Sequence, residues 1–317
     1  MPPLPPARDV IDAVLSTALP SAAGAALVTC MFLSLGRWAA ALGSAVAVVV
    51  GFGWANADWT PHPTDASEWA LPGRVIPWSP AVEAPTWHSL PRAAVILLVS
   101  GVVSRWLGSV VARYLDERRR WGAELLVWGV RSSIVAVVGP ALVPPALAGE
   151  VGWLKPAFIP VMLGLWVALD FVARDRAGHE VAAYLAAAFF AAGAVLIYHH
   201  TARFMDLAVM CGCAAGGVAL ASLPTRADAS GLVPLGVVGL PGLMLNGHYL
   251  VDSQVPVASF WLVALAPLGL IPSLIPSVAR LPRWVVITLR ALLVLSPLVV
   301  AVVLAAQHEQ LAFADEW

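Results

Sequence analysis

Residues 285–306 read VVITLRALLVLSPLVVAVVLAA, an apolar run in which Arg290 is the one charged residue. About 20 such residues form a helix that crosses the hydrocarbon core of a bilayer, which is about 30 Å thick. The run lacks the alternation of barrel strands, so it predicts a membrane helix. The whole chain agrees: of its 317 residues 60% are hydrophobic and 12% are charged, against about 25% charged in soluble domains. Its mean hydropathy is +0.83. We therefore predict an all-α, polytopic integral membrane protein.

The same rule finds further runs of suitable length, so we predict a single domain over residues 1–317 that is a bundle of about ten transmembrane helices. The other runs cover roughly residues 14–35, 38–56, 92–112, 124–147, 157–174, 181–200, 204–223, 231–250 and 256–279. The one long connection covers roughly residues 57–91. We expect it to form a cap on the outer side, with the tryptophans Trp59, Trp69, Trp78 and Trp87 at headgroup depth.

Basic residues are unevenly distributed among the connections. Arginine is frequent in every second one, for example at Arg113, at Arg118–Arg120 and at Arg283. Because cytoplasmic loops carry an excess of Lys and Arg, this bias predicts a multi-pass protein of the plasma (inner) membrane with both termini on the outer side. No basic region precedes the first apolar run, so we expect that run to remain as a membrane helix rather than to act as a cleaved signal peptide.

The balance of charges limits the partners that the protein can bind. The chain has 18 Lys and Arg against 19 Asp and Glu, so it lacks the basic surface of a nucleic-acid-binding protein. We expect the lipid bilayer and a small solute as partners. Gly212 and Gly216, four residues apart, allow close helix approach within the bundle or in a homodimer. The cysteines all lie in apolar runs, where we expect them to pack as small hydrophobic residues; they are Cys30, Cys211 and Cys213.

Histidine and aspartate side chains gather near the predicted outer surface. Such a set suits a transition metal or a proton relay, and the candidates are His199, His200, Asp206, His248 and Asp252. His248 and Asp252 share a face if one helix extends through both, although Asn246 to Tyr249 are equally typical of a turn. No ligand spacing such as His-Glu-x-x-His is present. We therefore predict no cofactor, and a transition metal stays an alternative.

Charged residues inside the predicted spans are the second candidate site. Such residues are rare in membrane helices and are functional by default. Arg131 lies deepest in its run, and Asp170 is the carboxylate nearest to it in depth. The two are candidates for binding a substrate, or for an ion pair that holds two helices together. Arg290 lies close to the end of its run, where its side chain can extend to the membrane surface.

Prolines favour one function over the others. Gly139-Pro140 and Pro144-Pro145 fall in the fourth run, and Pro267, Pro272 and Pro276 fall in the ninth. Broken helices at matching places in two halves are typical of transporters, so the best hypothesis is a secondary transporter or permease for a small solute. The alternatives are a membrane enzyme or metal-handling protein with a site on the outer side, and an assembly subunit without activity. No catalytic motif such as Gly-x-Ser-x-Gly is present, and no catalytic residue is predicted.

Overall fold

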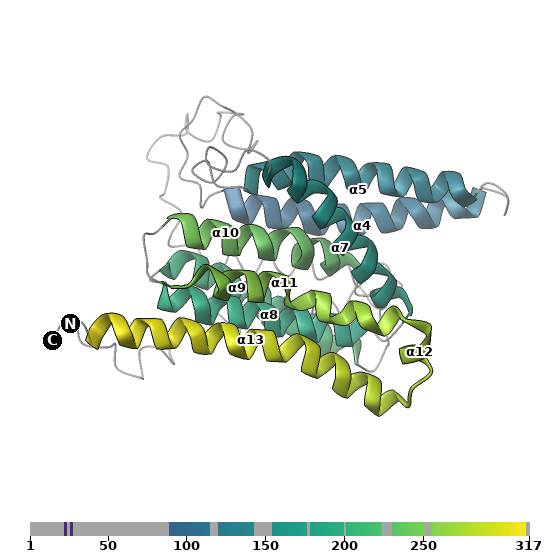
Figure 1. Ribbon diagram of the computed structural model, residues 1–317. Coiled ribbons are helices and arrows are strands. Elements are labelled where there is room, and N and C mark those ends of the chain that lie inside the picture. Colours follow the sequence, from purple (N-terminus) through teal and green to yellow (C-terminus); the bar gives the residue numbers. More distant parts are fainter. Residues whose placement is uncertain are drawn as a thin grey trace, which may run out of the picture.

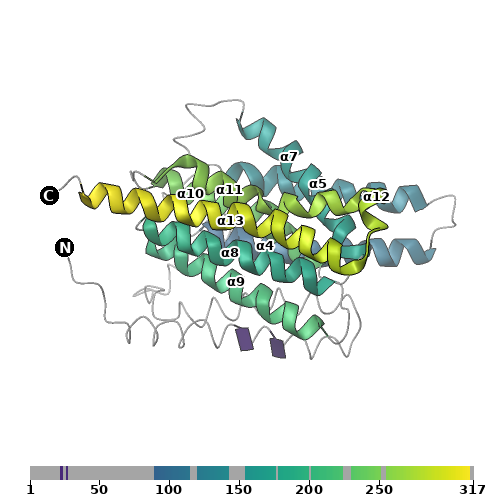
Figure 2. The ribbon, with the colours of Figure 1, turned by 60° about the horizontal axis from the view of Figure 1, so that its bottom comes forward.

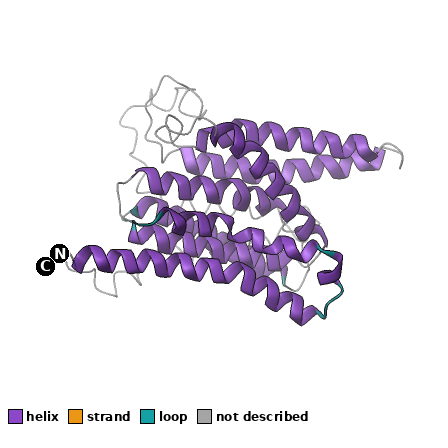
Figure 3. Cartoon of the chain, in the orientation of Figure 1, coloured by secondary structure: helices purple, strands orange, loops and turns teal. Residues whose placement is uncertain are grey.

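The computed structural model describes residues 22–23, 26–27, 89–114, 120–142, 154–175, 178–199, 201–223, 230–250 and 255–314. In these ranges the chain is almost entirely helical and contains no strand (Figures 1 and 3). Five of the described helical segments are long and apolar enough to cross a membrane: His179–Tyr198, Phe204–Ser222, Ser230–Tyr249, Val257–Leu274 and Arg283–His308. A helical membrane protein is thus the supported class, while a count of ten spans stays a prediction.

The predicted runs from residue 92 onward all coincide with helices. These are α4 (Ser89–Tyr114), α5 (Arg120–Leu142), α7 (Leu154–Asp175), α8 (Gly178–Tyr198), α9 (Ala202–Ser222), the segment Ser230–Leu250, the segment Val257–Ala279 and α13 (Arg283–Ala314). The first two runs lie outside the described residues except at 22–23 and 26–27, which are helical. The predicted cap also lies outside them up to Ser89, where α4 begins.

The segment Ser230–Leu250 forms the centre of the bundle and is buried along most of its length. It consists of the 3-10 turn η4 (Ser230–Leu232), the π-helical turn η5 (Leu235–Gly239) and α10 (Leu240–Leu250). Helices α4, α5, α7, α8, α9 and α11 (Val257–Leu265) all pack against it. The wider π turn ends at Gly239, two residues before Pro241, whose ring would clash with a carbonyl group of the preceding turn in a regular α-helix.

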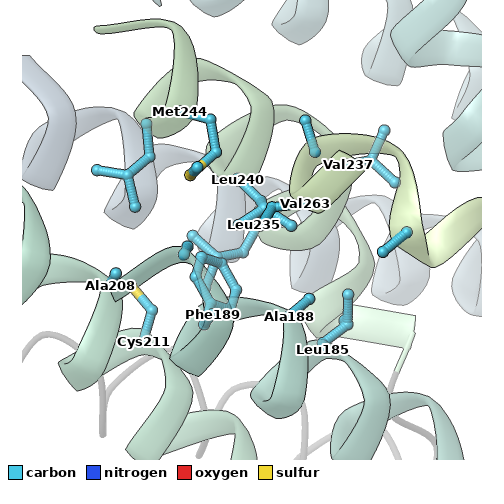
Figure 4. Close-up of a cluster of buried hydrophobic side chains, with 14 of the residues drawn as sticks. Leu185, Ala188, Phe189, Ala208, Cys211, Leu235, Val237, Leu240, Met244 and Val263 are labelled. Atoms are coloured by element: carbon cyan, nitrogen blue, oxygen red, sulfur yellow. The ribbon is translucent and has the colours of Figure 1, made fainter. Parts of the chain in front are cut away.

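Small residues let the helices approach the centre closely. A Cβ atom on Gly101 of α4 would lie 2.7 Å from the carbonyl oxygen of Gly231, and one on Gly242 would lie 2.8 Å from Leu142 of α5. Between these contacts the core is apolar: Figure 4 shows Phe189 of α8 among side chains of α9, α11 and the central segment. Close packing of this kind, rather than hydrophobic transfer, drives helix association in lipid.

Helices α8 and α9 form the most extensive helix pair, with α13 lying along α8 (Figure 2). Gly212 of α9 lies beneath the ring of Phe190, and Gly193 of α8 faces Val209. The prediction that Gly212 and Gly216 allow close approach is confirmed within the bundle, because a Cβ on Gly216 would also contact Ala186 of α8. Cys211 and Cys213 are buried on α9 as free thiols, as predicted.

The ninth predicted span is interrupted, in agreement with its prolines. Helix α11 ends at Leu265 and continues as the 3-10 helix η6 (Ala266–Leu274), which the short α12 (Pro276–Ala279) follows. Pro267 and Pro272 have no backbone N–H group to donate, and in a regular α-helix their rings would clash with the carbonyl groups four residues earlier. The tighter 3-10 form replaces it over nine residues, although such runs seldom exceed three or four.

The fourth predicted span does not match the prediction at Gly139-Pro140. Helix α5 continues through these two residues to Leu142, so the expectation of a break there is wrong. Pro140 lies in the last turn of α5, where few backbone hydrogen bonds remain to be disrupted. Pro144-Pro145 lies outside the described residues.

Candidate functional site

Arg131 lies at the middle of α5 with 1% of its surface exposed. Its Nη1 donates a hydrogen bond to Asp170 Oδ2 on α7 at 2.8 Å, and its Nε donates to Ser104 Oγ on α4 at 3.3 Å. Asp170 is 2% exposed. The guanidinium group therefore joins three helices, and the expectation that Asp170 is the carboxylate partner of Arg131 is confirmed.

Two tryptophan rings lie beside the guanidinium group. The Cζ atom of Arg131 is 4.6 Å from the ring centroid of Trp128 and 5.1 Å from that of Trp166. Both distances are within the range of cation–π attraction. Trp128 precedes Arg131 by three positions on α5, and Trp166 precedes Asp170 by four on α7, so each helix presents its charge and its ring on the same face.

This site has a larger set of residues than the sequence predicted. Arg131 and Asp170 were candidates on depth alone, whereas Ser104, Trp128 and Trp166 were not singled out. The helical spacing of the two tryptophans was a signal for them, but Ser104 depends on how α4 is rotated against α5. Trp166 is completely buried, and its Nε1 has no hydrogen-bond partner among the described residues.

A second buried arginine forms a similar site between α13, α8 and η6. Arg290 of α13 is 3% exposed; its Nη1 pairs with Glu180 Oε2 of α8 at 2.5 Å, and its Nη2 donates to Ser273 Oγ of η6 at 3.0 Å. Ser273 in turn donates to the carbonyl oxygen of Leu270. Arg290 is therefore buried and paired, and its partner Glu180 was not singled out from the sequence; the expectation that its side chain reaches the membrane surface stays a prediction.

Of the five candidates for a metal site, the structure brings two histidines together. The rings of His199 and His248 lie 5.8 Å apart beside Phe260, and His199 Nε2 is 3.2 Å from the carbonyl oxygen of His248. Since a carbonyl oxygen only accepts, Nε2 of His199 carries a proton and donates it. That nitrogen is therefore engaged with protein backbone in this structure.

Of the remaining metal candidates, one lies in the part of the chain that the structure describes. Asp206 is half-buried on α9, whereas His200 and Asp252 lie outside the described residues. In the described part of the chain no three His, Cys, Asp or Glu side chains are close enough to hold a metal ion. A site that includes His200 and Asp252 stays a prediction.

The segment from Asn246 to Tyr249 is helical, so its interpretation as a turn is wrong. Helix α10 continues to Leu250. Asn246 is buried and donates from Nδ2 to the carbonyl oxygens of Leu142 at 2.6 Å and Gly242 at 2.8 Å. These bonds attach the end of α5 to the central segment, which gives this polar residue a role in packing.

Two small pockets lie elsewhere in the bundle. One is lined by His248, Tyr249, Phe260 and Trp261, the other by Phe189, Leu207 and Cys211, each with other apolar residues. Each has a volume of about 10 Å³, the space of about one water molecule. Arg131 and Asp170 line neither of them, and the two residues are 1% and 2% exposed.

The functional interpretation therefore depends on this geometry, since no protein-family model, curated protein sequence or solved structure matches the chain.

Proposed function

We propose that the chain is a secondary transporter or permease for a small solute, with Arg131 and Asp170 at its binding site. The observation that carries this proposal is the ion pair between α5 and α7, which is buried within the helical bundle with 1% and 2% of the two residues exposed. Burying two charges costs several kcal/mol per ion, and apolar residues of similar volume often serve stability better. A charged pair within the bundle is therefore a functional feature by default.

The interrupted helix beside α7 supports a protein that changes shape. Helix η6 packs against α7, the helix that carries Asp170, and a 3-10 stretch within a longer helix often marks a hinge. Transporters commonly place discontinuous helices next to their binding sites. A movement of α7 with η6 would separate Asp170 from Arg131 and admit a solute.

A static assembly subunit is the second candidate. The observation in its favour is the enclosure of the pair, because Trp128, Trp166 and Ser104 surround Arg131 as in a packed core. In that case the pair would only hold α5 and α7 in register. The two functions differ in whether water ever reaches Arg131.

Cysteine accessibility at Ser104 distinguishes these functions without knowledge of the solute. Ser104 is completely buried and contacts Arg131. We would introduce Ser104→Cys into a chain whose native cysteines are replaced by alanine, and treat whole cells and inverted membrane vesicles with a membrane-impermeant methanethiosulfonate. Ala188→Cys, at a completely buried apolar position of α8, is the matched control.

A transporter requires that the thiol of the Ser104→Cys variant react from both sides of the membrane, while that of Ala188→Cys reacts from neither. Reaction of Ser104→Cys from one side only would indicate a surface pocket, as in an enzyme or a receptor. If the Ser104→Cys thiol is as inert as that of the control on both sides, the transport proposal is wrong and the assembly subunit is favoured.

A further inference from the structure

We infer that Arg290, Glu180 and Ser273 form a latch that holds the interrupted helix η6 against α13, and that opening of this latch gives access to the Arg131–Asp170 pair. The consequence for access rests on the proposed transport function, whereas the latch itself can be tested without transport. The latch is built from three elements, because Arg290 lies on α13, Glu180 on α8 and Ser273 in the last turn of η6.

The hydroxyl group of Ser273 joins Arg290 to the backbone of η6. Its oxygen accepts a hydrogen bond from Arg290 Nη2 at 3.0 Å, and its proton is donated to the carbonyl oxygen of Leu270 at 2.6 Å. Ser273 is 5% exposed and Arg290 is 3% exposed, so little water competes for this bond. Hydrogen bonds to a charged group are stronger than those between neutral groups. One side chain of α13 therefore fixes the position of the last turn of η6.

Opening of the latch would leave the charge of Arg290 paired. The guanidinium group also binds Glu180 Oε2 of α8 through Nη1, and α8 and α13 pack along each other. That ion pair does not involve η6, and Ser273 can keep its bond to Leu270 after it leaves Arg290. Helix η6 can therefore part from α13 with the loss of one hydrogen bond at this site, and no buried cation is left without its acid.

Both ends of η6 have the features of a hinge. At its start the chain changes from the α-helix α11 to the 3-10 form at Ala266, and a 3-10 stretch within a longer helix often marks a hinge. At its end Ile275 is extended, with φ −68° and ψ 125°, and it is 50% exposed. The chain then turns back through the short α12 into α13 (Figure 1). Such residues at the ends of elements absorb the backbone changes of a hinge movement.

Helix η6 connects the latch to the candidate site. It packs against α13 and also against α7, the helix that carries Asp170. When α7 moves away from α5, it either parts from η6 or takes η6 with it. The hinges at both ends of η6 favour the second movement, in which the bond between Ser273 and Arg290 has to break before Asp170 can part from Arg131. The latch therefore stabilises the closed state of the site, and opening of the site weakens the latch in return.

Ser273→Ala opens the latch with a small change in the core, because it removes the hydroxyl group and leaves the Arg290–Glu180 pair. Ser100→Ala on α4 is the matched control. Ser100 is also 5% exposed, and it also donates to a carbonyl oxygen three residues earlier, that of Leu97, at 2.7 Å. Arg290→Lys is a second variant with an open latch, since its ammonium group keeps the charge beside Glu180 but lacks the planar fork that reaches Ser273 at the same time.

Hydrogen exchange in the purified full chain measures the latch itself. The reporters are the amides of η6 and that of Ile275, which donates to the carbonyl oxygen of Pro272 at 3.1 Å. We expect them to exchange about tenfold faster in Ser273→Ala and in Arg290→Lys, as the loss of one hydrogen bond to a charged group implies. Exchange in α13 should stay at the wild-type rate, and Ser100→Ala should not change exchange in η6. No acceleration in η6, or an equal acceleration in η6 and α13, would overturn the inference.

Reaction of the Ser104→Cys thiol measures the consequence for access. In the chain without native cysteines, adding Ser273→Ala should make this thiol react about tenfold faster with the impermeant methanethiosulfonate, because the lost hydrogen bond shifts the population toward the open state. The acceleration should occur on the side of the membrane on which Arg280 and Arg283 lie. The thiol of Ala188→Cys should stay inert in the presence of Ser273→Ala, which excludes a general loosening of the bundle.

Failure of the latch and failure of the transport proposal give different results. If Ser104→Cys reacts in the parent chain but Ser273→Ala leaves its rate unchanged, the connection between latch and site is wrong, while transport is still supported. If the Ser104→Cys thiol is inert in every chain although exchange in η6 is faster in Ser273→Ala, the latch is supported and the transport proposal is wrong.

Discussion

At the scale of single residues, the two buried arginines have the same kind of surroundings. Arg131 is paired with Asp170 and contacts the hydroxyl group of Ser104; Arg290 is paired with Glu180 and contacts that of Ser273. In both cases the arginine, the acid and the serine come from three different helical segments. Each guanidinium group therefore connects three segments through hydrogen bonds, which an apolar side chain of the same volume cannot form.

Removing one member of the Arg131–Asp170 pair should be far more harmful than removing both. We expect Arg131→Met or Asp170→Leu alone to lower the free energy of unfolding by about 3–5 kcal/mol, because each leaves a buried charge without its partner in this ion pair. The double variant R131M/D170L should be close to the wild type or more stable. Unfolding in mixed micelles titrated with a denaturing detergent measures these differences.

A matched variant at an exposed position shows whether burial causes the loss of stability in the single Arg131 and Asp170 variants. Glu124 on the same helix is exposed, so Glu124→Gln should change the free energy of unfolding by about 0.5 kcal/mol or less. Single Arg131 and Asp170 variants that behave like Glu124→Gln would show that the pair is hydrated, contrary to its burial.

At the scale of helical elements, the unusual contact is that between η6 and α13. Gly269 of η6 approaches the backbone of α13 so closely that a Cβ atom would lie 2.6 Å from the carbonyl oxygen of Leu293. The atom it would meet belongs to a helix backbone, which cannot rotate away as a side chain does. The close approach also brings Ser273 within reach of Arg290.

Gly269→Ala should therefore separate η6 from α13 and destabilise the protein. We expect a loss of about 1–3 kcal/mol, the usual range for overpacking, measured as a lower unfolding temperature of the purified protein. Gly129→Ala on α5 is the control, since a Cβ there meets nothing within 4 Å. That substitution should stabilise by about 0.5–1 kcal/mol through helix propensity, and equal effects of the two variants would contradict the packing argument.

At the scale of the whole molecule, the positions of the helices are supported by the structure, whereas the orientation in the membrane rests on the sequence. The apolar runs after residue 92 are helices, and five described segments have the length and composition of membrane spans. Orientation depends on the distribution of arginine in the loops, and many of those loop residues lie outside the described ranges. The orientation is therefore a prediction that labelling can test.

Cysteine labelling on intact cells should show residues 57–91 on the outer side. In a chain without native cysteines, Ser67→Cys should react with a membrane-impermeant maleimide before lysis, because its loop carries few arginines. Ala177→Cys, in a connection that follows Arg174 and Arg176, should react only after lysis. The reverse pattern would invert the orientation of the whole chain.

Part of the site could be predicted from the sequence, because the depth of a residue within its helical run can be counted along the chain. The position of Arg131 within its run and that of Asp170 within the next both follow from counting residues along helices, so their pairing was accessible. Glu180 was not, because it lies at the start of α8 and reads as a residue at the membrane surface. The site of histidines and aspartates stays a prediction, because His200 and Asp252 lie outside the described residues.

The apolar runs of the chain are enough to predict a helical protein of the membrane class and the positions of its helices after residue 92. These properties depend on local runs of apolar residues, which are long enough to satisfy every backbone hydrogen bond within one helix. The fold is needed to see which charges meet: Arg131 with Asp170 beside two tryptophan rings, and Arg290 with Glu180. Those contacts depend on how each helix is rotated against its neighbours. Close packing at small residues such as Gly101 and Gly269 fixes that rotation, and the segments that it joins are distant in the chain.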